Sequence, residues 1–180
     1  MTSAPPCVAA GSIDTRDRVS FIARFGAVFE HSPWVAEGAW AARPFVDGHA
    51  LHRAMVAVLH ASDRQARLVL LRAHPELWGA EARARRITSD STIEQAHAGL
   101  LALSAEDANR IERMNAAHQR RFGFPFIIAA MEHTRAQIFA EFERRLALDV
   151  EAEFDACLAE VERITALRIE RLLGGGGDAR

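Results

Sequence analysis

Two short segments carry side chains suited to proton transfer. The first is His74-Pro75-Glu76 and the second is Ser91-Thr92-Ile93-Glu94-Gln95. An imidazole has an ordinary pKa of ~6.5, which is the side-chain value nearest neutral pH, so His74 is a candidate acid or base. Glu94 follows it at a distance along the chain that lets a loop bring both side chains to one pocket. These segments are therefore the candidate site.

The second segment also has the composition of a helix start. Residues 89–91 are serine or aspartate, which cap helices well, and the free N–H groups of a helix N-terminus suit an anionic ligand. An acidic residue in a first turn is ordinary, so Glu94 alone does not identify a site. Ser91 lacks the Gly-x-Ser-x-Gly context, which makes a serine hydrolase a weak hypothesis.

An arginine in the last expected helix gives an independent indication. The apolar stripe of this helix passes through Arg168 and otherwise consists of Val150, Phe154, Cys157, Val161, Ile164 and Leu172. A buried guanidinium is costly unless an anion pairs with it. We therefore expect Glu94, another carboxylate or an anionic ligand opposite Arg168, whereas Arg163 and Arg171 should face solvent.

Helical periodicity dominates the elements that must position these groups. Apolar residues recur at three- and four-residue spacing, and alternation at period two is almost absent, which predicts an all-α domain of about eight helices. The first helix is expected over 15–29 with Val19 buried, and Ser32 should cap the second with Pro33 at its first position. Caps of later helices are expected at Asp47, Asp63, Ser104, Thr134 and Asp149.

Two segments depart from this pattern. Phe124-Pro125-Phe126-Ile127-Ile128 follows a helix stop at Gly123 and looks extended, but no partner strand is apparent, so we expect a buried connector crossing the core. Pro75 should end the fourth helix. The arginine-rich stretch 78–87 is expected to be a loop, with Arg83, Arg85 and Arg86 in solvent.

Composition narrows the class of protein. The chain has 180 residues, 49% of them hydrophobic and 26% charged, with a net charge of −2. This predicts one globular domain over 12–173, between flexible tails at 1–11 and 174–180. Basic and acidic residues are balanced and interspersed, so nucleic acid is a poor partner hypothesis.

Two cysteines, Cys7 and Cys157, make a disulfide framework improbable. No apolar run approaches the ~20 residues of a membrane span, and the N-terminus does not resemble a secretory signal. A cytoplasmic protein is therefore expected. His-Glu-x-x-His is absent, so no metal site is expected. The other histidines should have solvated or capping roles: His31, His49, His52, His60, His97, His118 and His133.

The chain as a whole resembles a known family, the 2-oxo-4-hydroxy-4-carboxy-5-ureidoimidazoline (OHCU) decarboxylases of urate breakdown. The resemblance runs from about Ser12 to Leu173 and includes the two candidate segments. The matched segments, in order, are Val28-Phe29-Glu30-His31-Ser32-Pro33-Trp34, Ala73-His74-Pro75-Glu76-Leu77, Ser91-Thr92-Ile93-Glu94-Gln95 with Ala98-Gly99-Leu100, and Arg121-Phe122-Gly123-Phe124-Pro125-Phe126-Ile127.

The resemblance implies an all-helical, cofactor-free decarboxylase that is commonly dimeric and acts on a small ureide. It places His74, Glu94 and Arg168 in the catalytic group. It places the substrate contacts at Pro75, Ser91, Gln95, Phe126, Ile127, Ile128, Ala129 and Ala130. The implied reaction yields (S)-allantoin and carbon dioxide.

The residues alone are also compatible with two other classes of protein. One is a hydrolase of a cyclic ureide that uses the same groups to activate water. The other is a helical interaction module in which residues 74–95 form a structural turn and Arg168 pairs internally. The chirality and ring state of the product distinguish these readings.

Overall fold

Helices account for every regular element in the part of the chain that the structure describes. The computed structural model describes residues 13, 17–79, 88–98, 100 and 103–174. Eight α-helices and two 3-10 helices lie in these ranges, so the all-α expectation is confirmed. They are α1 (Arg18–Phe25), α2 (Trp34–Ala39), η1 (Trp40–Ala42), α3 (Gly48–Ala61), α4 (Arg64–Ala73), α6 (Ser89–His97), α7 (Ala105–Phe122), η3 (Ala130–Glu132), α8 (Arg135–Arg145) and α9 (Val150–Gly174).

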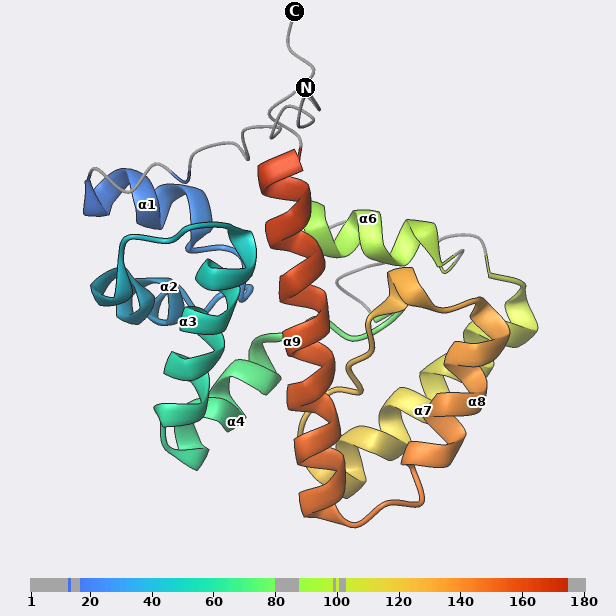
Figure 1. Cartoon of the computed structure of the whole chain (residues 1–180). Helices are drawn as coiled ribbons and strands as arrows, with labels where there is room; N and C mark the ends of the chain where they lie inside the picture. Colours follow the sequence, from blue (N-terminus) through green and yellow to red (C-terminus); the bar gives the residue numbers. More distant parts are fainter. Residues whose placement is uncertain (1–12, 14–16, 80–87, 99, 101–102, 175–180) are drawn as a thin grey trace, which may run out of the picture.

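The long helix α9 is the centre of the arrangement. Figure 1 shows it between α1 to α4 on one side and α6, α7 and α8 on the other. It contacts α3, α4 and α7, while α2 packs between α1 and α3. A helix that touches both groups can bring residues of distant segments to one place, and Arg168 lies near its C-terminal end.

Local capping determines most helix starts, as expected. The side chains of Asp47, Asp63, Ser104 and Thr134 each accept a hydrogen bond from a backbone N–H of the first turn of the helix that follows. Asp149 accepts from the N–H of Ala152 in the same way. Gly123 ends α7 with a φ of 78°, the left-handed conformation that glycine adopts without steric cost.

Three boundary expectations were wrong by a few residues. Thr88 caps α6 in place of residues 89–91, and Pro33 occupies the N-cap of α2 in place of Ser32. Asp17 caps α1, which ends at Phe25, so the expected helix over 15–29 is much shorter. Val19 is 78% exposed because Phe21 and Phe25, one turn apart, form the buried face of this helix.

The connector after Gly123 is extended and buried, as expected, and it separates two apolar clusters. Ile127 and Ala129 belong to the cluster formed mainly with α1 to α4 and α9. Phe126, Ile128 and Ala130 belong to the cluster formed with α7 and α8. Successive side chains of an extended chain point to opposite sides, so one short segment contributes to both clusters.

Several expectations concern residues outside the described ranges. They concern the expected flexible tails, at 1–11 and 175–180, and most of the expected loop over 78–87 with its arginines. Within the described ranges, no helix has the length and apolar character needed to cross a membrane.

Candidate active site

His74 lies at the C-terminal end of α4, where Pro75 prevents another helical turn. Its side chain is buried, and neither ring nitrogen has a hydrogen-bond partner among the described residues. The pKa of His74 is lowered from 6.5 to about 4, chiefly by burial and also by the charge of Arg168, while the charge of Glu30 opposes the shift. The imidazole is therefore neutral near pH 7, with both nitrogens free to meet a ligand.

The two candidate segments meet at one small cavity. Its volume is about 20 Å³, enough for roughly one water molecule. Most residues that the sequence singled out line it, and Leu77 and Ile164 were not foreseen. The lining residues are His74, Pro75, Leu77, Ser91, Glu94, Gln95, Phe126, Ile127, Ile128, Ala130 and Ile164. The backbone N–H of Ala129, also predicted here, donates to Glu160 instead.

Arg168 is buried and paired, as its place in the apolar stripe predicted. Its Nε and Nη2 atoms donate to the two carboxylate oxygens of Glu94 at 2.7 and 2.8 Å. Nη2 also donates to Oε1 of Glu30 at 2.6 Å, and Nη1 donates to the carbonyl of Val28 at 3.1 Å. Burial disfavours the charge, but the hydrogen bonds and charges of the two carboxylates outweigh it and raise the pKa of Arg168.

This pairing changes the expected role of the arginine. Arg168 does not line the cavity, and its N–H groups are directed at acceptors of the protein. Glu30 and Glu94 together outweigh its single positive charge, so this cluster has a net charge of −1. The guanidinium thus fixes the two carboxylates rather than offering an open cationic site to a ligand.

Glu30 is a charged residue next to the site whose role sequence reasoning missed. It lies in a turn after α1 with a φ of 49°, a left-handed conformation that is uncommon for a residue with a side chain. Its Oε1 accepts hydrogen bonds from Ser91 at 2.5 Å and from Arg168. The available signal was its place in the matched segment 28–34, but an expected helix through Phe29 concealed the turn that directs it inward.

Gln95 connects α6 to the segment that follows His74. Its Oε1 accepts from the N–H of Trp78 at 3.0 Å, and its Nε2 donates to the carbonyl of Glu76 at 3.4 Å. From α7, Nδ2 of Asn115 donates to the carbonyl of Leu77 at 2.8 Å. These contacts hold the residues after Pro75 against α6 and α7.

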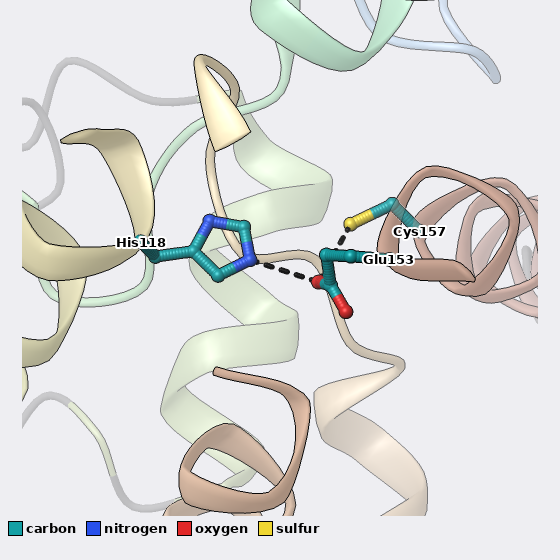
Figure 2. A group of neighbouring side chains, drawn as sticks. All are labelled: His118, Glu153 and Cys157. Atoms are coloured by element: carbon teal, nitrogen blue, oxygen red, sulfur yellow. Dashed lines mark hydrogen bonds and ion pairs between the residues drawn. The ribbon is translucent and has the colours of Figure 1, made fainter. Parts of the chain in front are cut away.

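A second buried polar cluster contacts the backbone of the connector. Figure 2 shows His118 of α7 pointing toward Glu153 and Cys157 of α9. Nε2 of His118 lies 2.8 Å from Glu153 Oε1, and its Nδ1 lies 3.0 Å from the carbonyl oxygen of Phe124. The expectation of a solvated or capping role was wrong for His118, which has no exposed surface.

The ligand-like atoms of His118, Glu153 and Cys157 lie within 4.8 Å of one another, close enough to suggest a metal site. The guanidinium of Arg145 already donates to both oxygens of Glu153 and, at 2.9 Å, to the sulfur of Cys157. Burial raises the pKa of the Cys157 thiol to about 12, which disfavours the thiolate that binds metals. A metal ion would have to displace this arginine, so the cluster is a structural ion-pair network.

This network holds the connector in place. Arg145 donates to the carbonyl of Ile127 at 2.7 Å, and the thiol of Cys157 lies 3.8 Å from the carbonyl oxygen of Pro125. Together with the contact from His118 to Phe124, three carbonyl groups of the connector are bound. Buried carbonyls need such partners, and here the partners fix the segment that lines the candidate site.

A larger hollow of about 420 Å³ lies elsewhere, between α3 and the C-terminal part of α9. Its polar groups are partly engaged: Asp47 caps α3, and His52 lies 3.1 Å from the hydroxyl of Thr165. It includes none of the predicted site residues. The larger hollow is therefore not the one that the candidate catalytic residues line. The unpartnered buried atoms of His74 favour the smaller cavity as the active site.

Arg171 corrects a further expectation. It was expected in solvent, but its side chain is only 32% exposed and its Nη2 lies 3.1 Å from Asp90 and 3.6 Å from Glu94. Arg163 is 59% exposed, as expected. The C-terminal part of α9 thus presents two arginines to α6, with Arg168 inside and Arg171 at the edge.

Comparison with known proteins gives one consistent result. The family model described as OHCU decarboxylase matches residues 14–170. The 2-oxo-4-hydroxy-4-carboxy-5-ureidoimidazoline decarboxylase of Mus musculus is 36% identical over 90% of this chain and 91% of its own length. The protein of the same name from Haloferax volcanii is 38% identical over 87% of this chain and 91% of its own.

A solved structure also matches. The crystal structure of (S)-allantoin synthase superimposes with a TM-score of 0.69 and 25% sequence identity, covering 88% of this chain and 51% of that chain. The family match spans both candidate segments, the connector and Arg168. The chain therefore belongs to the OHCU decarboxylase family.

Proposed function

We propose that this protein decarboxylates 2-oxo-4-hydroxy-4-carboxy-5-ureidoimidazoline to (S)-allantoin and carbon dioxide, in the breakdown of urate, without a cofactor. The observation that carries the proposal is a buried histidine, neutral near pH 7, whose unpartnered nitrogens share a cavity with Glu94. Family membership supports it, as do the names of the relatives.

The substrate itself supplies the electron sink. When the bond from C4 to the carboxylate breaks, carbon dioxide leaves and the electron pair forms a C4=C5 double bond. In the same step the electrons of the C5=N double bond move to nitrogen, which takes a proton from solvent. The 4-hydroxyl next loses its proton as the C4 carbonyl forms, and a proton adds to C5. The carboxylate is thus replaced by one hydrogen.

His74 has the position and protonation state to carry these protons. As a neutral base it would take the 4-hydroxyl proton, and as the resulting imidazolium it would protonate C5 from one face, which gives one enantiomer. Glu94 would accept a hydrogen bond from the 4-hydroxyl or ureido group. Ser91 and Gln95 would contact the polar edge of the ring, and Pro75 would keep the His74 backbone in place beside it.

The apolar side of the cavity would favour the loss of charge from the carboxylate. The connector, from Phe126 to Ala130, provides this side with buried apolar side chains and backbone. A cavity of about 20 Å³ cannot enclose an imidazoline ring with two substituents, since ligand pockets usually measure ~300 Å³ or more. Substrate binding therefore requires the side chains around His74 and the connector to separate.

The test is to generate the substrate in situ by enzymatic urate oxidation and to follow allantoin by circular dichroism. Wild-type protein should accelerate the formation of one-handed allantoin, and the H74N variant should lose ~10²- to 10⁴-fold in kcat while remaining folded. Activity should survive dialysis against a chelator. Ring-opened allantoate would instead indicate a cyclic ureide hydrolase, and no acceleration would indicate an interaction module.

Assembly and location complete the proposal. We propose a homodimer with a small ureide as its ligand, as the family resemblance implies, and a cytoplasmic location, as the composition favours. Sedimentation velocity of the purified protein measures its oligomeric state, and a monomer at micromolar concentration would contradict the proposed homodimer.

A further inference from the structure

We propose that Glu30 is a fourth acidic or basic group of this site, after His74, Glu94 and Arg168: a positioning residue that holds Arg168 and Ser91 with one carboxylate oxygen and keeps a negative charge near His74. The inference rests on the proposed decarboxylase function and extends it to a residue outside the two candidate segments. Glu30 would act through its neighbours and would not itself contact the substrate.

Burial and several hydrogen bonds hold the side chain of Glu30 in one position. It is 4% exposed and lies in a turn whose φ of 49° turns the chain inward after α1. Its Oε1 is 2.6 Å from Nη2 of Arg168, accepts from Ser91 and lies 3.4 Å from the hydroxyl of Thr88. One oxygen therefore joins the N-terminal part of the chain to α6 and α9.

The other oxygen is left without a partner. Oε2 of Glu30 is buried and has no hydrogen bond within the described residues, and the same is true of both ring nitrogens of His74. A buried, unpaired carboxylate oxygen is costly, and such atoms are rare in folded proteins. If His74 takes a proton during turnover, its ring nitrogens must be free to accept it. An ionised carboxylate nearby, such as that of Glu30, then stabilises the imidazolium.

The charges around His74 support the assignment. Glu30 is the group that raises the pKa of His74, whereas burial, Arg168 and His31 lower it. Burial tends to raise the pKa of Glu30, but Arg168, His74 and the hydrogen bond from Ser91 lower it overall, so this carboxylate is ionised near pH 7. When His74 takes the substrate proton, Glu30 would be the anion that offsets the new charge, while Glu94 balances Arg168.

Glu94 cannot replace Glu30 in this role. Both oxygens of Glu94 accept from Arg168, so its charge is fully engaged by the guanidinium, and it lines the cavity where the substrate would bind. Glu94 is also not among the groups that alter the pKa of His74. The two carboxylates on one arginine thus have different roles, and E94Q is the matched control for E30Q.

The experiment compares E30Q, E30D and E94Q with the wild type. E30Q should remain folded, because Glu94 still neutralises Arg168 and the new amide oxygen can accept from Arg168 and Ser91. We expect its kcat to fall by roughly 10²-fold, with a smaller change in KM. The acidic limb of its pH–rate profile should move to lower pH, since His74 loses the charge that favours its protonated form.

The two other variants separate charge from position. E94Q should change KM and kcat but leave the acidic limb where it is in the wild type. E30D keeps the charge but withdraws the carboxylate by one methylene, so it should keep the wild-type limb and lose kcat. An E30Q limb that coincides with the wild type, or an E30D variant with wild-type kcat, would overturn the proposal.

A readout without turnover distinguishes this inference from the proposed function. The His74 ring signal, assigned by its loss in H74N, can be titrated by imidazole NMR in wild-type and E30Q protein. A lower His74 pKa in E30Q supports the inference even if the wild type proves inactive on the ureide, which would refute the decarboxylase proposal alone. Equal pKa values in the two proteins would refute the role of Glu30.

Discussion

Protonation of His74 should account for part of the loss of stability of this protein in acid. In the folded protein its pKa is lowered from 6.5 to about 4, chiefly by burial. The unfolded chain therefore binds a proton at His74 that the folded protein does not bind, over the pH range between these two values. Stability from this residue is fully present above pH 6.5 and is lost as the pH falls toward 4.

The magnitude follows from the size of this interval. It spans roughly 2.5 pH units, and each unit corresponds to ~1.4 kcal/mol, so the free energy of unfolding should decrease by about 3 kcal/mol. That is a large fraction of the ~5–15 kcal/mol stability of a typical domain. Other groups also titrate in this range, so the contribution of His74 must be measured as a difference from a variant.

The assay is urea unfolding of the wild type and H74N at several pH values between about 7 and about 4. Asparagine cannot become charged, so the variant should lack this part of the pH dependence and lose less stability on acidification. The difference between the two curves should grow by about 3 kcal/mol toward the acidic end. Parallel curves would refute the conclusion that the imidazole is buried and neutral.

Four further outcomes can be checked. R168M should cost about 3–5 kcal/mol in urea unfolding, because it leaves two buried carboxylates unpaired; an unchanged midpoint would contradict the pairing. E153Q should lower the melting temperature and raise KM, because Arg145 loses its buried anion and the connector loses its support; normal KM in a folded variant would remove that support role. G123A should cost about 1 kcal/mol by chemical unfolding, owing to its φ of 78° and not to crowding, since the nearest atom to an added Cβ is 3.5 Å away. Cys157 should resist alkylation in the native protein and react once it is unfolded in urea, as mass spectrometry of the modified peptide would show; rapid native labelling would show that it is accessible.

Helix starts were largely predictable because they depend on neighbours in the sequence. The caps at Asp47 and Thr134 need only a side-chain oxygen and the N–H groups two or three residues later. The extended connector was predictable for a similar reason, since Pro125 and its apolar neighbours cannot form an exposed helix. Arg168 was also predictable, because an apolar stripe that includes a charge requires a partner.

Three of the errors share one cause. Val19, His118 and Glu30 each depend on which elements pack against them, and the local sequence contains no record of that. Val19 was assigned to the buried face because a longer first helix was assumed. His118 was assigned to the surface because α8, α9 and the connector cover it only in the folded protein.

The amino-acid sequence by itself determined the helical class, most helix ends, the two candidate segments and the need for an anion beside Arg168. These follow from interactions within a few residues and from the cost of burying a charge. Only the tertiary structure decided which anions meet that arginine, that Glu30 joins the site from a distant turn, and that the His74 ring is buried without a partner. The physical reason is that desolvation and ion pairing depend on the atoms that surround a group in space, and α9 assembles those atoms from segments far apart in the chain.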